Sequence, residues 1–253
     1  MSAIRRPLRR AALLLFPGES LREDVLDTIL REGFTDVGIG VKTTPTVPGQ
    51  GFSIPQAREL AAMCQARHLG IIAFTGYMKY QEALLNREPQ RTMILSGRGR
   101  ILDLDGLPVR WLCPFRPENK SLYLDLLREI CQWPAARDIH LNDEASLGFR
   151  GGVIGCYCDY CRARFRAATG AEPPVAADWS SPLWRRWIEH RLSTWTAIHA
   201  ELRDEIRRLR PDIAVGIQHS PYVPEHVYSA WESGIALARD ARAMDFISTD
   251  PYH

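Results

Sequence analysis

Three cysteines are crowded into one short stretch, the motif Cys-Tyr-Cys-Asp-Tyr-Cys at residues 156–161. Loops this short disfavour disulfide closure, whereas a metal ion readily takes several thiolate ligands from one tight turn. Structural zinc sites use four such ligands, and Cys113 is the fourth candidate because its segment leads to the same end of the predicted sheet. The alternative is a set of unligated thiols on a loop. The predicted structural zinc ligands are Cys113, Cys156, Cys158 and Cys161.

A second polar group, Asn142-Asp143-Glu144, directly follows the apolar run at residues 138–141. Two carboxyl groups about 5 Å apart can cleave a glycosidic bond with retention, and a wider spacing leads to inversion. Glu144 is the candidate acid of such a pair, and Asp143 can raise its proton affinity by like-charge repulsion. The alternative is that both acidic residues merely cap the loop.

Short apolar runs alternate with amphipathic stretches along the chain, which predicts a parallel sheet covered by helices. The predicted strands are residues 11–16, 36–41, 71–75, 138–141, 213–218 and 246–249. The predicted helices are residues 21–31, 53–68, 119–133, 183–209 and 231–241. After the third strand, residues 91–95 and 100–104 flank the turn sequence Ser-Gly-Arg-Gly, which predicts a β-hairpin insertion.

This alternation fits both a barrel and an open doubly wound sheet. No Gly-x-Gly-x-x-Gly motif or phosphate loop follows the first strand, so a (β/α)8 TIM-type barrel is favoured over a nucleotide-binding open sheet. A barrel needs eight strands, and the chain supplies about six. We therefore expect one catalytic-type barrel domain over residues 1–253, incomplete at its C-terminus, with a zinc-knuckle loop after strand four.

The motif Ile-His-Leu-Asn-Asp-Glu at residues 139–144, followed by the cysteine motif and Phe165, resembles the family-42 β-galactosidases of glycoside hydrolase clan A. That family shows an Asn-Glu pair ending strand four, then a Cys-x-Cys-x-x-Cys knuckle, and an earlier Cys-Pro that Cys113 and Pro114 match. The resemblance spans roughly residues 91–252. It implies a retaining hydrolase of carbohydrate substrates with Glu144 as general acid/base, structural zinc and no organic cofactor.

The sequence also departs from the family. The Asn-Glu pair is Asp143-Glu144 here, so the residue that bonds the sugar 2-hydroxyl is changed or shifted to Asn142. The clan's nucleophile is a glutamate ending strand seven, which this chain does not contain. Tyr252 corresponds by similarity to a tyrosine that orients the nucleophile. The substrate-binding residues expected at strand ends are Asn142, His219, Asp250 and Tyr252.

Two other function classes remain open from the residues. One is a non-catalytic carbohydrate-binding or scaffold protein on a decayed barrel. The other is a metal-dependent hydrolase, whose candidate ligands would be His140, His219, Asp250 and His253. The hypothesis of a metal-dependent hydrolase is weakened because the chain has no helical His-Glu-x-x-His motif.

Composition excludes several partners. The formal net charge is only +2, with both signs interspersed, so no nucleic-acid footprint is expected. No apolar run approaches the roughly 20 residues of a membrane span. The run at residues 11–16 is shorter than the roughly 7–15 residues of a signal-peptide core, which favours a cytoplasmic protein. Cys64 and Cys131 lie on apolar helical faces and are expected in the core. A homo-oligomer remains open.

Overall fold

The computed structural model of the chain describes residues 9–15, 17–42, 51–76, 78–79, 81–141, 146–149, 151–219 and 230–249. Its centre is a six-stranded sheet in the order β1-β2-β3-β6-β9-β10, in which every neighbouring pair is parallel. The strands are β1 (Ala11–Leu14), β2 (Asp36–Lys42), β3 (Gly70–Gly76), β6 (Ala136–Leu141), β9 (Ala214–His219) and β10 (Phe246–Thr249). All six predicted core strands are confirmed, and the sheet is that of a partial TIM barrel. Among the described residues, β1 and β10 do not pair to close it.

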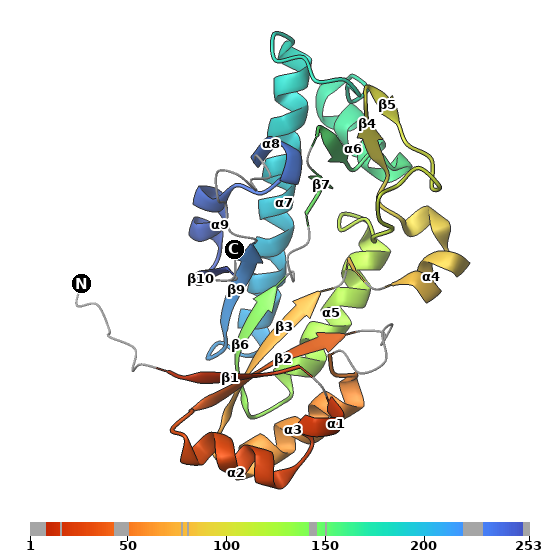
Figure 1. Ribbon diagram of the computed structural model, residues 1–253. Helices are drawn as coiled ribbons and strands as arrows, with labels where there is room; N and C mark the ends of the chain where they lie inside the picture. Colours follow the sequence, from red (N-terminus) through yellow and green to blue (C-terminus); the bar gives the residue numbers. More distant parts are fainter. Residues whose placement is uncertain are drawn as a thin grey trace, which may run out of the picture.

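Helices occupy the connections between successive strands of this sheet (Figure 1). They are α1 (Pro17–Ser20), α2 (Glu23–Arg31), α3 (Ile54–Ala66), α4 (Glu82–Arg87), α5 (Pro117–Cys131), α6 (Asp159–Thr169), α7 (Pro182–Leu209), α8 (Ala230–Ser233) and α9 (Leu237–Ala243), with a 3-10 turn at Pro89–Arg91. Ser53 and Gln56 form a capping box that starts α3. Within the described ranges, no helix combines the length and apolarity needed to cross a membrane.

Helix α7 links the sheet to a second, smaller layer. It packs on α5, α9 and β9 and extends past the sheet toward α6 and α8 (Figure 1). There a four-stranded antiparallel sheet has the order β5-β4-β8-β7. Its strands are β4 (Leu95–Gly97), β5 (Arg100–Ile101), β7 (Gly148–Phe149) and β8 (Val153–Gly155). The insertion after β3 therefore pairs directly with the segment that follows β6.

The hairpin insertion is confirmed, with Arg98 and Gly99 both at positive φ in its turn, but its strands β4 and β5 are shorter than expected and end close to the turn. The single helix predicted over residues 231–241 is wrong. Gly234 has φ +76, a left-handed conformation that ends α8, and α9 begins only at Leu237.

Aromatic rings fill one face of the parallel sheet. His140 lies between the rings of Phe74 and Phe246, with centroid distances of 4.4 and 4.7 Å, and its Nδ1 is 2.9 Å from Ser248 Oγ. Gly216 opposes His140 in the β6–β9 register, and a Cβ there would meet the Phe246 ring at 2.1 Å. The absence of a side chain at Gly216 therefore makes room for Phe246 beside His140.

A buried network of ion pairs lies near the amino-terminal ends of the strands. Asp36 at the start of β2 is fully buried, and Arg9 donates to both of its carboxylate oxygens while also pairing with Asp138 at 2.7 Å. Burial alone raises the pKa of Asp36, but the hydrogen bonds from Arg9 and Thr35 and the charge of Arg9 outweigh it and leave the pKa lowered. This network ties the segment before β1 to β2 and β6.

The Asp36→Asn variant is expected to lose about 2–4 kcal/mol of unfolding free energy near pH 7, because Arg9 loses its buried counter-charge. The lowered folded-state pKa means that this stabilisation is present above the unfolded pKa of about 3.9 and is lost as the pH falls through the folded pKa. Wild-type stability should therefore fall more steeply than that of the variant below about pH 4. Urea unfolding near pH 7 and near pH 3 measures both effects.

Asp24→Asn is the matched control, because the Arg22–Asp24 pair is exposed to solvent and should contribute little. If Asp36→Asn were as stable as this control at neutral pH, the buried network would not stabilise the fold.

Candidate metal centre and the loops around it

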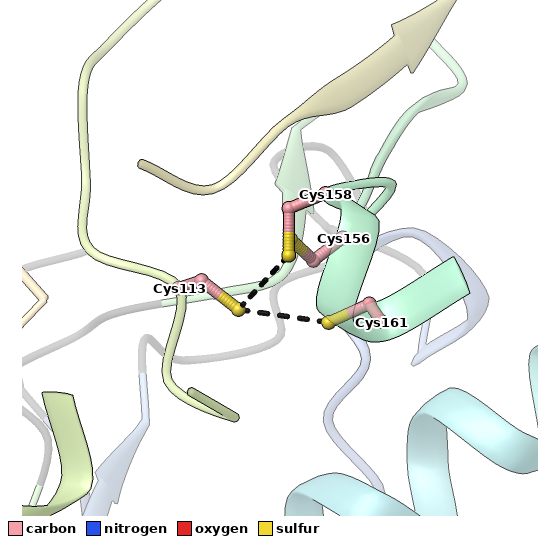
Figure 2. A group of neighbouring side chains, drawn as sticks. All are labelled: Cys113, Cys156, Cys158 and Cys161. Carbon is pink, nitrogen blue, oxygen red and sulfur yellow. Dashed lines mark hydrogen bonds between the residues drawn. The ribbon is translucent and has the colours of Figure 1, made fainter. Parts of the chain in front are cut away.

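The four predicted cysteine ligands come together in the structure. The Sγ atoms of Cys113, Cys156, Cys158 and Cys161 all lie within 4.8 Å of one another, and all four side chains are buried. Figure 2 shows them pointing toward one another from two separate segments, with Cys113 Sγ 3.5 Å from Cys161 and 3.7 Å from Cys158. None is in a disulfide.

Two segments hold this cluster in place. Cys156 directly follows β8, Cys158 caps the start of α6, and Cys161 lies in the first turn of that helix. Cys113 is fixed through its backbone, because its N–H donates to Arg91 and its carbonyl accepts from Asn119. The Tyr157 N–H donates to the Ile94 carbonyl at 2.7 Å, so the knuckle and the hairpin insertion are joined.

The cluster fits a tetrahedral metal site. A Zn–S bond of about 2.3 Å implies Sγ–Sγ separations of about 3.8 Å in a regular tetrahedron, close to the separations seen here. Four soft sulfur ligands in a buried position are the donor set typical of structural zinc and iron–sulfur sites. Among the described residues, this is the one group of side chains that could hold a metal ion.

The electrostatic environment favours a thiolate at Cys158. Hydrogen bonds from Cys113, Cys156 and Cys161 lower the pKa of Cys158, whereas burial raises the pKa of Cys113 and hydrogen bonds with the other sulfur atoms raise that of Cys161. Arg116 is 8% exposed and lies beside the cluster, where the charges of Cys158 and Asp159 outweigh the effect of burial and raise its pKa. A guanidinium in this place stabilises the deprotonated sulfur that binds metal.

The remaining two cysteines behave differently. Cys64 in α3 and Cys131 in α5 are buried in the apolar core, which confirms the prediction for both. Burial raises the pKa of Cys64 to about 12 and that of Cys131 to about 11. Both remain protonated thiols that pack as small apolar side chains.

The predicted catalytic residues follow the central part of the sheet. Strand β6 lies between β3 and β9, and its last residue, Leu141, precedes the acid motif. Strand β10 pairs with β9, and Asp250 comes directly after it. The carboxyl ends of β6, β9 and β10 therefore lie along one edge, where barrel enzymes place their chemistry. Five of the predicted site residues lie outside the described residues: Asn142, Asp143, Glu144, Asp250 and Tyr252.

His219, expected at the substrate cleft, has a different environment. It is 1% exposed, and its Nε2 lies 3.2 Å from Oδ2 of Asp240 in α9. Side chains alternate along β9, so His219 faces the helices while Gly216 faces the aromatic side of the sheet. The geometry gives His219 a contact with the helix layer. Gln218 shares the face of Gly216, as the alternation along the strand requires.

Two other histidines, His199 and His140, are neutral at physiological pH because their pKa values are lowered. Burial lowers the pKa of His199 in α7 to about 4, and burial with the charge of Arg9 lowers that of His140 to about 4. His140 and His219 are two of the candidate ligands of the metal-dependent hydrolase hypothesis. They lie on opposite faces of the sheet, so they do not face a common metal ion. His253 lies outside the described residues.

Comparisons with known proteins show the fold. No family model matches the sequence, and no curated protein matches it significantly. A β-galactosidase from the haloarchaeon Halorubrum lacusprofundi superposes with a TM-score of 0.70 at 13% identity, covering 98% of this chain and 40% of that one. A GH42 β-galactosidase from G. stearothermophilus gives 0.67 at 15% identity, covering 97% and 40%. The PgaB (BpsB) glycoside hydrolase domain from Bordetella bronchiseptica gives 0.68 at 15% identity, covering 96% and 74%.

The chain thus has a (β/α) fold similar to that of solved β-galactosidases, one of them a GH42 enzyme, in agreement with the resemblance of its sequence motifs. At these identities the likeness concerns the fold. The chain spans about two fifths of the length of the β-galactosidases that it matches.

Proposed function

We propose that this chain forms part of a retaining glycoside hydrolase in which Glu144 is the general acid/base. The supporting observation is positional: Glu144 follows β6, the fourth strand of a parallel sheet whose fold is shared with several glycoside hydrolases. Function in such barrels resides at the carboxyl ends of strands, and a carboxylic acid there can protonate a departing glycosidic oxygen. The domain proposed is a single (β/α) unit over residues 1–253.

In the proposed reaction, Glu144 gives its proton to the leaving-group oxygen as the sugar–oxygen bond breaks. A carboxylate about 5 Å away attacks the anomeric carbon, and Glu144 then takes a proton from the water that releases the sugar. We place that nucleophile in polypeptide outside these 253 residues. Asp143 supports the protonated form of Glu144 by charge repulsion, and Asn142, Asp250 and Tyr252 are proposed to bind the sugar.

We further propose that the four-cysteine cluster binds one zinc ion with a structural role. Four thiolates complete the tetrahedron and leave no position for a substrate or water, so the metal would fix the loops. The cluster holds together the hairpin insertion after β3 and the segment after β6. Since none of the six cysteines is in a disulfide, a cytoplasmic location is also proposed.

The stereochemistry of the first product tests the mechanism. The full-length protein should hydrolyse members of a panel of aryl glycosides, with aryl β-galactosides included, and NMR should show the released sugar with the anomeric configuration of its substrate. Product of the opposite configuration would contradict the retaining mechanism and would place the two carboxyl groups farther apart. Saccharide binding without turnover of any glycoside would contradict the proposed activity and favour the non-catalytic carbohydrate-binding protein.

A further inference from the structure

Arg191 is a fully buried cation that takes no part in the proposed reaction. Arg191, in the middle of α7, is 1% exposed, and its guanidinium donates to four backbone carbonyls. Nε donates to Gly155, one terminal nitrogen donates to Trp231, and the other donates to Leu147 at 3.0 Å and Glu232 at 2.8 Å. Within the described parts of the chain, no carboxylate lies at ion-pair distance from it.

These four carbonyls belong to two loops at the carboxyl edge of the sheet. Leu147 and Gly155 are the two ends of the β7–β8 hairpin, which runs from the segment after Glu144 to the first residue before Cys156. Trp231 and Glu232 belong to α8, in the connection that follows β9. Arg191 therefore contacts, at one point, the backbone that follows β6 and the backbone that follows β9.

Other hydrogen bonds between the same segments surround this point. The Leu147 N–H donates to the Ser233 carbonyl, and the Gly155 N–H donates to the Leu147 carbonyl, both at 2.7 Å. Oε1 of Glu232 accepts from the Gly152 N–H at the tip of the hairpin, at 2.8 Å. The guanidinium is thus the centre of a network in which nearly every acceptor is main chain.

Packing alone does not require an arginine here. Burying a guanidinium away from carboxylates is costly, and burial lowers its pKa to about 10, although it remains charged at neutral pH. An apolar side chain of similar length would fill the volume without that cost. The rigid fork of five N–H donors can bond all four carbonyls at once, whereas an ammonium group has only three donors and an apolar chain has none.

We propose that Arg191 is a positioning residue that fixes the β7–β8 hairpin against α8, and that this one contact positions the chain on both sides of the hairpin, which leads back to Glu144 and forward to Cys156. The catalytic part of this inference rests on the proposed function, because it takes Glu144 as the acid. Arg191 acts through the main chain of the hairpin and has no contact of its own with the sugar.

The kinetic test compares Arg191→Lys with Arg185→Lys in the full-length protein. Arg185 lies on the same helix and also donates to backbone carbonyls, of Trp179 and Ser180, but it is exposed. Arg191→Lys is expected to lower kcat for an aryl glycoside about 100-fold while KM changes less than about threefold, because the acid is displaced without loss of the sugar contacts. Metal content should stay at the wild-type level. A kcat equal to that of Arg185→Lys would overturn the proposal.

Hydrogen exchange tests the hold on the backbone without relying on turnover. The amides of Leu147, Gly152 and Gly155 should exchange about tenfold faster in Arg191→Lys than in Arg185→Lys, since charge-assisted bonds to the segment are lost. Unchanged exchange would refute the positioning role even in an active enzyme. If the wild type hydrolyses no glycoside but exchange changes as expected, the proposed function fails while the structural role of Arg191 stands.

A second variant keeps the proposal testable if Arg191→Lys does not fold. A Cβ at Gly148 would meet the Glu232 carbonyl at 2.3 Å and the Val153 carbonyl at 2.6 Å. Gly148→Ala should therefore push the hairpin from α8 with Arg191 intact and reduce kcat by a similar factor. Wild-type kcat in this variant would contradict the idea that the hairpin must be held against α8.

Discussion

Replacing Glu144 by glutamine is expected to reduce turnover of glycosides with poor leaving groups by about 10²–10⁴-fold, because the amide cannot donate the proton that the departing oxygen needs. Substrates whose leaving groups are already acidic need little protonation, so their bond-cleavage step should be affected less. Steady-state kinetics of the full-length protein on a series of aryl glycosides with graded leaving-group pKa measures this difference. Unchanged hydrolysis across the series would remove Glu144 from the mechanism.

Asp143→Asn is the matched control for this experiment. It removes a neighbouring negative charge and leaves the carboxyl of Glu144 in place, so catalysis should persist. Without the repulsion from Asp143, Glu144 should lose its proton at a lower pH. The high-pH limb of the kcat profile is therefore expected to move to lower pH. A loss as large as that of Glu144→Gln would show that Asp143 has a catalytic role of its own.

Disruption of the cysteine cluster should have the largest effect on stability. Cys158→Ser is expected to abolish the binding of about one metal ion per chain and to destabilise the fold beyond the roughly 0.5–3 kcal/mol of ordinary substitutions. The reason is that Cys158 joins the knuckle to Cys113, and all four sulfur atoms are buried. Elemental analysis gives the metal content, and urea unfolding with and without a chelator gives the stability.

Cys131→Ala provides the control, since Cys131 is a core cysteine of α5 outside the cluster. It should lose some packing free energy but keep the metal. A wild-type protein that is free of metal, yet as stable with chelator as without it, would contradict the proposed site.

The sequence predicted those features that depend on local pattern. Each core strand contains a short apolar run bounded by turn residues, and all six were found, because the strands of a parallel sheet covered by helices are largely apolar. The cysteine cluster was also predicted in full, since ligand spacing within the knuckle is fixed by coordination chemistry and only Cys113 required reasoning about topology.

Features that depend on tertiary contacts were missed or misplaced. The β7–β8 hairpin has strands of two and three residues and exists because β8 pairs with β4, a contact far along the chain. Helical periodicity across residues 231–241 concealed the left-handed turn at Gly234. His219 was expected at the cleft because it ends a strand; the sequence pattern did not predict its contact with Asp240 on a separate helix.

Cys113 and Cys158 are 45 residues apart, and the chain between them contains α5 and β6. A metal bound to both would act as a cross-link around a closed loop of that length, which by chain-entropy arguments restricts the unfolded chain by about 4 kcal/mol. The restricted loop includes the strand that leads to Glu144. Oxidation of the thiols or loss of the ion is therefore expected to release α5 and β6 together as one cooperative unit, before the β1–β2–β3 part of the sheet unfolds.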